Sequence, residues 1–240
     1  MIVLLLTLQS IPTVALTARF RSPRVRESSG VAVSRAHRGV LWTHNDSGDD
    51  AYVYATDLAG TDRGVVRIRG ARAVDWEDIA LGPCPTGGGA CLYVADTGDN
   101  ERVRKSVVIY AVPEPDPPAR GGGTMRSAAA TALRLRYRDG PDDVEAIYAS
   151  PRDSALYVVS KGRSGVVQLY RVSEIYTFVP GARGVLTPSG WPVCNVTGLE
   201  PQGEAIDFLD DSTFVLTSEA TAMRRELIHT VRCPGRHREE

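Results

Sequence analysis

Hydrophobic and polar positions alternate along this chain in short runs that recur four times. Each recurrence opens with a glutamate followed by small and branched apolar residues, and two further apolar runs follow it. The opening segments are ESSGVAV at Glu27, DWEDIAL at Glu77, DDVEAIYA at Glu145 and QGEAIDF at Glu204. The second runs are Val40–Trp42, Leu92–Ala95, Leu156–Val159 and Phe214–Leu216, and the third are Tyr52–Thr56, Val107–Val112, Val167–Val172 and Leu227–Val231. Short runs bounded by turn residues predict β-strands.

The opening glutamates lie about 50–70 residues apart, a spacing typical of β-propeller blades. We therefore predict an all-β fold, a β-propeller of four to five short antiparallel blades with one blade reduced or missing. Val65–Arg69 and Leu133–Tyr137 are predicted as outer strands. Val14–Phe20 is predicted to close the ring by pairing with the last repeat, and Pro113–Gly123 is predicted to be a surface loop.

Composition agrees with one globular domain. The 240 residues are 42% hydrophobic and 24% charged, which excludes a disordered chain and a coiled coil. The 28 basic and 29 acidic residues give a net charge of −1, so no overall positive field attracts nucleic acid or an anionic membrane surface. We expect a monomer whose partner is a small molecule or a protein.

The N-terminus predicts export. Met1–Leu8 is apolar and too short to span a bilayer, so residues 1–18 are interpreted as a signal peptide and residues 19–240 as a single propeller domain. The protein is then secreted or periplasmic and has no membrane span. The alternative is a buried first strand, because Val14–Phe20 also alternates well enough to be one.

The four cysteines are consistent with an oxidising compartment. Cys84 and Cys91 bracket the turn-rich PTGGGA, so a disulfide between them would close a short loop between two strands. A second disulfide would join Cys194 to Cys233. The alternative is that the cysteines are buried free thiols.

The recurring glutamates are the candidate site. The first strand of each propeller blade lines the central channel, so Glu27, Glu77, Glu145 and Glu204 are expected to converge on a common axis. Converging carboxylates repel one another and need a divalent cation, a basic side chain or protonation to neutralise them. Calcium suits such oxygen ligands. Asn45, at the end of a second run, is added as a fifth candidate ligand.

Two further residues are candidates for catalysis. Lys161 is one of only two lysines in the chain. It is either an electrostatic group acting on a substrate or a salt-bridge partner that replaces the metal, and Lys161 or an arginine inserted between the glutamates would rule out a divalent metal site. His44, with Asp46 or Glu77 as an orienting carboxylate, is a candidate general base. The alternative for His44 is a hydrogen-bonding turn residue. Trp42 and Trp76 are predicted to pack between blades.

Several segments carry a family resemblance. RESSGVAVS, VLWTHNDSGD, DWEDIALGP, LYVADTGDN, DDVEAIYASP, LYVVSKG, PQGEAIDF and FVLTSEA resemble the strand motifs of uncharacterised secreted bacterial β-propeller proteins. These are similar to the TolB-like, phytase-like and gluconolactonase-like propellers. The resemblance implies a propeller fold with calcium held at the channel near the five candidate ligands, and hydrolysis of lactones or phosphate esters. This chain departs from the pattern before QGEAI, where such relatives carry a further repeat.

Three hypotheses for function follow. The first is a secreted propeller module whose acidic channel mouth binds a ligand, a cation or a protein partner without catalysis. The second is a calcium-dependent hydrolase of lactone, phosphoester or carboxylester substrates. The third is a purely structural extracellular domain whose channel carboxylates pair with Lys161 and with arginines. The fold alone cannot decide between them, because one propeller architecture serves many functions.

Overall fold

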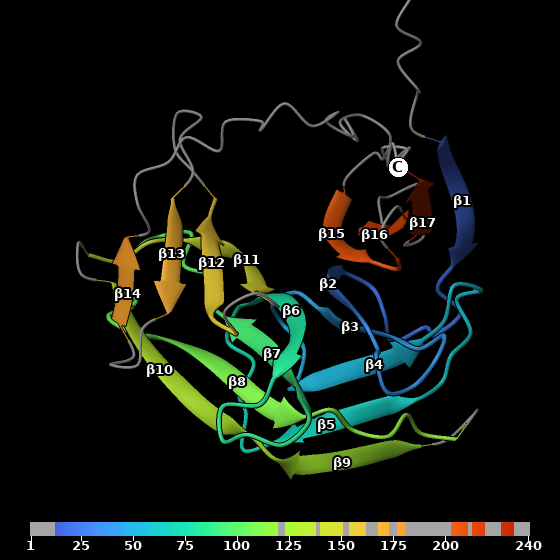
Figure 1. The fold of residues 1–240 in the computed structure, drawn as a ribbon, viewed down its shortest axis with the longest axis horizontal. Helices are drawn as coiled ribbons and strands as arrows, with labels where there is room; N and C mark the ends of the chain where they lie inside the picture. The colour runs from blue at the N-terminus through green and yellow to red at the C-terminus, as the bar shows by residue number, and fades with distance from the viewer. Residues whose placement is uncertain are drawn as a thin grey trace, which may run out of the picture.

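The computed structural model describes residues 13–119, 123–137, 140–150, 154–161, 168–172, 177–180, 203–210, 213–218 and 227–232. All regular secondary structure in these residues is β-strand, as predicted. The strands form four small antiparallel sheets arranged around a common axis, so the fold is a four-bladed β-propeller (Figure 1). The predicted four to five blades therefore number four. Among the described residues no helix is long and apolar enough to cross a membrane.

Each blade contains four antiparallel strands, which are listed below from the innermost to the outermost. Blade 1 consists of β2 (Ser28–Val33), β3 (Leu41–Asn45), β4 (Tyr52–Thr56) and β5 (Val65–Arg69). Blade 2 consists of β6 (Trp76–Pro83), β7 (Ala90–Asp96), β8 (Val107–Pro113) and β10 (Thr131–Tyr137). Blade 3 consists of β11 (Val144–Ala149), β12 (Leu156–Ser160), β13 (Leu169–Val172) and β14 (Thr177–Pro180). Both predicted outer strands are confirmed as β5 and β10.

The N-terminal strand completes blade 4, as predicted. This blade consists of β15 (Gly203–Phe208), β16 (Thr213–Ser218), β17 (Leu227–Arg232) and β1 (Thr13–Arg19). β1 is antiparallel to β17 from Thr13 opposite Arg232 to Arg19 opposite Leu227. The first strand of the chain thus pairs with the last and covers an edge that would otherwise expose unpaired backbone groups.

The closing strand β1 overlaps the end of the predicted leader, residues 1–18. A cut after residue 18 would fall inside β1, so the folded domain begins no later than Thr13. The alternative interpretation of this run as a strand is the one that the structure supports. The predicted leader itself stays a prediction, because residues 1–12 lie outside the described residues.

The outer edges of neighbouring blades are joined by parallel pairing. β9 (Thr124–Ala129) leaves blade 2 and pairs in parallel with β5 of blade 1, and β10 pairs in parallel with β14 of blade 3. The segment from residue 114 to 119 forms no strand, which agrees with the predicted loop. The prediction missed β9, because the sequence TMRSAA has no run of alternating apolar residues.

The core lies between the blades. One cluster joins blades 1 and 2 and contains both Trp42 and Trp76, which are 0% and 1% exposed. The predicted packing of these tryptophans between blades is confirmed. Two further clusters pack blade 2 on blade 3 and blade 1 on blade 4. This apolar packing fixes the positions of the inner strands.

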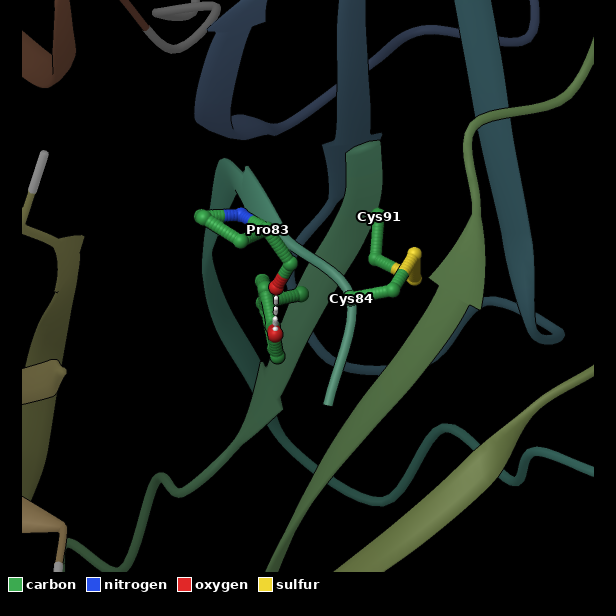
Figure 2. Close-up of a disulfide and its surroundings, with 4 residues drawn as sticks. Pro83, Cys84 and Cys91 are labelled. Carbon is green, nitrogen blue, oxygen red and sulfur yellow. Dashed lines mark hydrogen bonds between the residues drawn. A yellow bond between two sulfur atoms is a disulfide. The ribbon is translucent and has the colours of Figure 1, made fainter. Parts of the chain in front are cut away.

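The Cys84–Cys91 disulfide is present and links the end of β6 to β7 (Figure 2). Beside it, the Tyr93 hydroxyl donates a hydrogen bond to the carbonyl oxygen of Pro83. Free thiols are therefore excluded for this pair. The predicted partners Cys194 and Cys233 lie outside the described residues.

Candidate functional site

A β-bulge recurs at the same register position in all four inner strands. The residue that lacks a cross-strand partner is Glu77 in β6, Glu145 in β11 and Glu204 in β15. In β2 that residue is Ser29. Because a bulge changes the direction of its side chain, the repeated bulge explains why three of the predicted glutamates are equivalent.

Glu27 does not share this position, which corrects the sequence alignment of the repeats. It precedes β2, its side chain is exposed, and its carbonyl oxygen accepts the Asp46 amide at 2.9 Å. Ser29 takes the equivalent place in blade 1, and its hydroxyl donates to the main-chain oxygen of Glu77 at 2.8 Å. Glu204 lies at the bulge of blade 4, but its side chain is outside the described part of the structure.

Five carboxylates gather at the end of the ring where the inner strands begin, which we call the mouth. Oxygens of Asp46, Asp75 and Glu77 lie within 4.8 Å of one another, as do oxygens of Glu77, Asp143 and Glu145. We call these five residues the acidic cluster. It draws on three adjacent blades, because Asp46 follows β3 while the other four lie at the start of β6 and β11. The structure thus brings Glu77 and Glu145 together.

Three members of the acidic cluster were not among the predicted metal ligands, and one of them, Asp46, was predicted only as an orienting carboxylate for His44. The other two, Asp75 and Asp143, were not predicted as site residues at all. Each lies two positions before a bulge glutamate, in the segments DWE and DVE. The repeated D-x-E pattern is the sequence signal that would have identified them.

Glu77 is the most perturbed carboxyl of the cluster. Its side chain is 7% exposed, and burial raises its pKa to about 9, with further contributions from the negative charges of Glu145, Asp46, Asp75 and Asp143. Burial also raises the pKa of Asp75. Within the described residues no basic side chain forms an ion pair with Glu77. Without a bound cation, Glu77 therefore holds a proton at neutral pH.

Lys161 neutralises one edge of the cluster. Its Nζ lies 2.9 Å from Glu145 Oε1 and also donates to Asn100 Oδ1 at 3.5 Å. The predicted salt bridge is therefore present. The lysine side chain is 54% exposed, so it contacts the cluster from the solvent side, and it supplies one positive charge against five carboxylates. The ion pair argues against a metal at Glu145 but leaves Glu77 without a counter-ion.

The loop after β7 packs directly on the cluster. A Cβ atom at Gly98 would collide with Glu77 Oε1 and would lie 2.5 Å from Asp75 Oδ2, so any side chain there would displace these two carboxylates. The Asp99 carboxylate accepts the backbone amides of Val103 and Arg104 at 2.9 and 2.8 Å, which fixes the turn. The DTGDN segment is therefore a scaffold that brings its backbone against the acidic side chains.

Asn45 has a structural role. Its Oδ1 accepts the backbone amides of Arg26 and Glu27 at 2.8 and 3.2 Å. Its Nδ2 donates to the Arg24 carbonyl at 2.8 Å and to Asp49 Oδ2 at 2.7 Å. The amide that was predicted as a metal ligand is used instead to hold the chain that enters β2.

His44 lies within β3 rather than in a turn. Its side chain is 0% exposed, Nδ1 is 2.8 Å from the Asn45 carbonyl oxygen, and the ring packs edge-on against Trp76. Burial lowers its pKa to about 4, so the imidazole is neutral. A substrate at the mouth has no direct access to this ring, which does not suit a general base.

Two other inner-strand carboxylates join neighbouring blades. Asp78 Oδ2 accepts the amide of Ile147 at 2.9 Å, which links blade 2 to blade 3. Asp207 Oδ2 accepts the amide of Val33 at 2.5 Å, which links blade 4 to blade 1. Burial raises the pKa of Asp78 to about 8 and raises that of Asp207. These residues are structural and lie outside the acidic cluster.

The fold and the cluster together define a four-bladed propeller with an acidic mouth. Comparison of the sequence with protein-family models and with curated proteins found no match. The function therefore has to be argued from the geometry of the site.

Proposed function

We propose that this protein is a secreted or periplasmic propeller module that binds a divalent cation, calcium by preference, at the acidic cluster. The bound cation would hold an oxygen-bearing ligand or partner at the mouth. The observation that carries the proposal is Glu77, a buried carboxylate shared by two carboxylate triads and without a basic partner among the described residues.

The spacing of the oxygens supports a calcium-sized ion. Calcium binds oxygen ligands at about 2.3–2.6 Å, so ligand atoms on opposite sides of one ion are about 5 Å apart. The oxygens of each triad lie within 4.8 Å of one another. Calcium accepts six to eight ligands in loose geometry, whereas magnesium needs a near-ideal octahedron. Irregular carboxylates from several loops are better suited to calcium.

Export is supported by the Cys84–Cys91 disulfide, because disulfides persist mainly in oxidising compartments. The apolar N-terminus and the family resemblance suggest the same location. The hydrolase alternative has less support: His44 is buried, and the Lys161 ammonium is bound to Glu145. A hydrolase of this kind would depend on a metal-bound water for its nucleophile.

Thermal melting after removal of metal ions tests the proposal. A ligand that binds only the native state raises the melting temperature, because it stabilises that state by RT ln(1 + L/Kd), where L is the concentration of free ligand. We expect calcium to raise it, manganese and magnesium to raise it less, and sodium at equal ionic strength to leave it unchanged. Absence of a shift with all three divalent ions would reject the proposal. Turnover of lactone or phosphoester substrates that requires calcium would instead favour the hydrolase.

A further inference from the structure

A second charged feature lies on the outer edge of blade 1, where β5 and β9 run side by side (Figure 1). Val66 and Ile68 of β5 are buried, whereas Arg67 and Arg69 alternate with them on the exposed face. The parallel register places Arg126 of β9 directly beside Arg67. Three arginines therefore meet on one face of two adjacent strands.

These arginines line a cavity of about 220 Å³. Ile68, Gly70 and Ala71 complete its lining. Pockets that hold drug-sized ligands measure about 300–1,000 Å³, so this one fits a small ion or a single terminal group. We call it the arginine cavity.

The positive charge of the arginine cavity is not balanced locally. Within the described residues, Arg67, Arg69 and Arg126 form no ion pair with a carboxylate. Asp50, which precedes β4 on the neighbouring side, is exposed and forms none with them either. Like charges on adjacent strands destabilise a sheet, and a bound anion would remove that repulsion.

Neighbouring contacts fix the backbone at Arg69 and the position of the Arg67 side chain. The Arg69 amide donates to Ser127 Oγ at 3.0 Å, and the Arg69 carbonyl accepts the Ala130 amide at 2.9 Å. The Arg67 guanidinium lies 5.9 Å from the centre of the Tyr52 ring, within the range of a cation–π contact. The β5–β9 pair is thereby fixed before any ligand arrives, which lowers the entropic cost of binding.

We propose that the arginine cavity binds a tetrahedral oxyanion, that is, a phosphate or sulfate group. The planar guanidinium presents paired N–H donors that match two oxygens of such a group, so several arginines can each bind it through two hydrogen bonds. The site is separate from the acidic cluster: one charge sign gathers at the mouth and the other on the outer edge of blade 1. The group is either a free ion or the headgroup of a lipid.

Calorimetric titration with inorganic phosphate and sulfate, in calcium-free buffer at constant ionic strength, tests this proposal. We expect binding by the wild type and at least about tenfold weaker binding by Arg126→Gln and Arg67→Gln. Arg134→Gln is the matched control, because Arg134 is an exposed arginine on β10 outside the cavity, and it should bind like the wild type. The proposal would be overturned if the wild type did not bind either anion, or if Arg134→Gln lost as much affinity as the two cavity variants.

Three further measurements complete the test. Near-UV circular dichroism of each variant verifies its fold, and calcium binding by the Arg126→Gln variant should be unchanged if the two sites are independent. Vesicles containing phosphatidylglycerol separate the two sources of the group: co-sedimentation lost in Arg126→Gln assigns a lipid headgroup, and titration by free phosphate alone assigns a soluble ion.

Discussion

The Lys161 ammonium lies 2.9 Å from Glu145 Oε1 at the solvent side of the acidic cluster. This ion pair divides the cluster into two unequal parts. Glu145 has a permanent counter-ion, whereas Glu77 is neutralised by a proton or by a bound cation. Hydrogen bonding and the charges of Glu145, Asp143 and Glu77 raise the pKa of Lys161, so it stays charged at neutral pH. Lys161 and a divalent ion therefore compete for the same carboxylates.

Replacing Lys161 is expected to strengthen calcium binding. The substitution Lys161→Gln removes the competing positive charge and frees Glu145 as a ligand. Because the lysine is half exposed, we expect only a few-fold decrease in the Kd for calcium, measured by calorimetry at low salt. Lys105→Gln is the control, since Lys105 is the other lysine, is exposed and lies outside the cluster. Weaker binding by Lys161→Gln would contradict this interpretation.

The stability of the metal-free protein is expected to fall as pH rises. The folded pKa of Glu77 is about 9, above its unfolded value of about 4.5. Between these values the native state binds a proton that the unfolded state lacks, so the free energy of unfolding decreases with rising pH until it levels off above pH 9. Urea unfolding from pH 7 to 9 in the presence of a chelator measures this slope, above the range in which His44, with its folded pKa of about 4, contributes a slope of opposite sign.

The variant Glu77→Gln identifies the residue responsible. It cannot ionise, so the slope should become shallower, and Asp78, whose folded pKa is about 8, contributes to the slope that remains. At pH 9 without metal the variant should be more stable than the wild type by about 1 kcal/mol or more, because no buried charge is left unpaired. An unchanged slope would show that Glu77 does not titrate between folding states in this range.

The disulfide is expected to contribute a moderate part of the stability. Cys84 and Cys91 are seven residues apart, and closing so short a loop in the unfolded chain is worth about 2–3 kcal/mol. The double substitution Cys84→Ser with Cys91→Ser should lower the urea midpoint accordingly. A reductant should lower the urea midpoint of the wild type by the same amount and leave the midpoint of the double variant unchanged. A further effect of reductant on the double variant would point to another disulfide.

If the exported protein loses a leader, cleavage is expected before Thr13. A cut after residue 18 would remove most of β1 and leave the edge of β17 unpaired. N-terminal sequencing or intact mass of the protein recovered from an exporting host measures the cleavage point. A mature chain that starts at Arg19 would contradict the closure of the ring by β1.

Much of the fold could be predicted because the repeated apolar runs report directly on the strands. The spacing of the glutamates predicted the blades, and the alternation in Val14–Phe20 predicted the closing strand. β9 could not be predicted, because its pairing with β5 depends on tertiary contacts between blades and not on its own sequence. The boundary after residue 18 stays a prediction, and it falls inside β1, which spans Thr13–Arg19.

The site was predicted less completely, and the reason is register. Glu27 resembles the other glutamates in sequence, but its blade has Ser29 at the bulge, a two-residue shift in register that no local pattern reveals. His44 and Asn45 lie at the end of the right strand, β3, but their side chains are engaged in buried hydrogen bonds and packing. Glu77 and Glu145 were predicted correctly as converging residues because the repeat places them at equivalent positions.

Calcium binding to wild-type protein and to Glu77→Gln, measured by isothermal titration calorimetry, tests the central proposal most directly. Glu27→Gln is the matched control, because Glu27 is an exposed glutamate outside the acidic cluster. The account predicts binding by the wild type and by Glu27→Gln, and at least about tenfold weaker binding by Glu77→Gln. Undetectable binding by the wild type, or equal affinity in all three proteins, would contradict it.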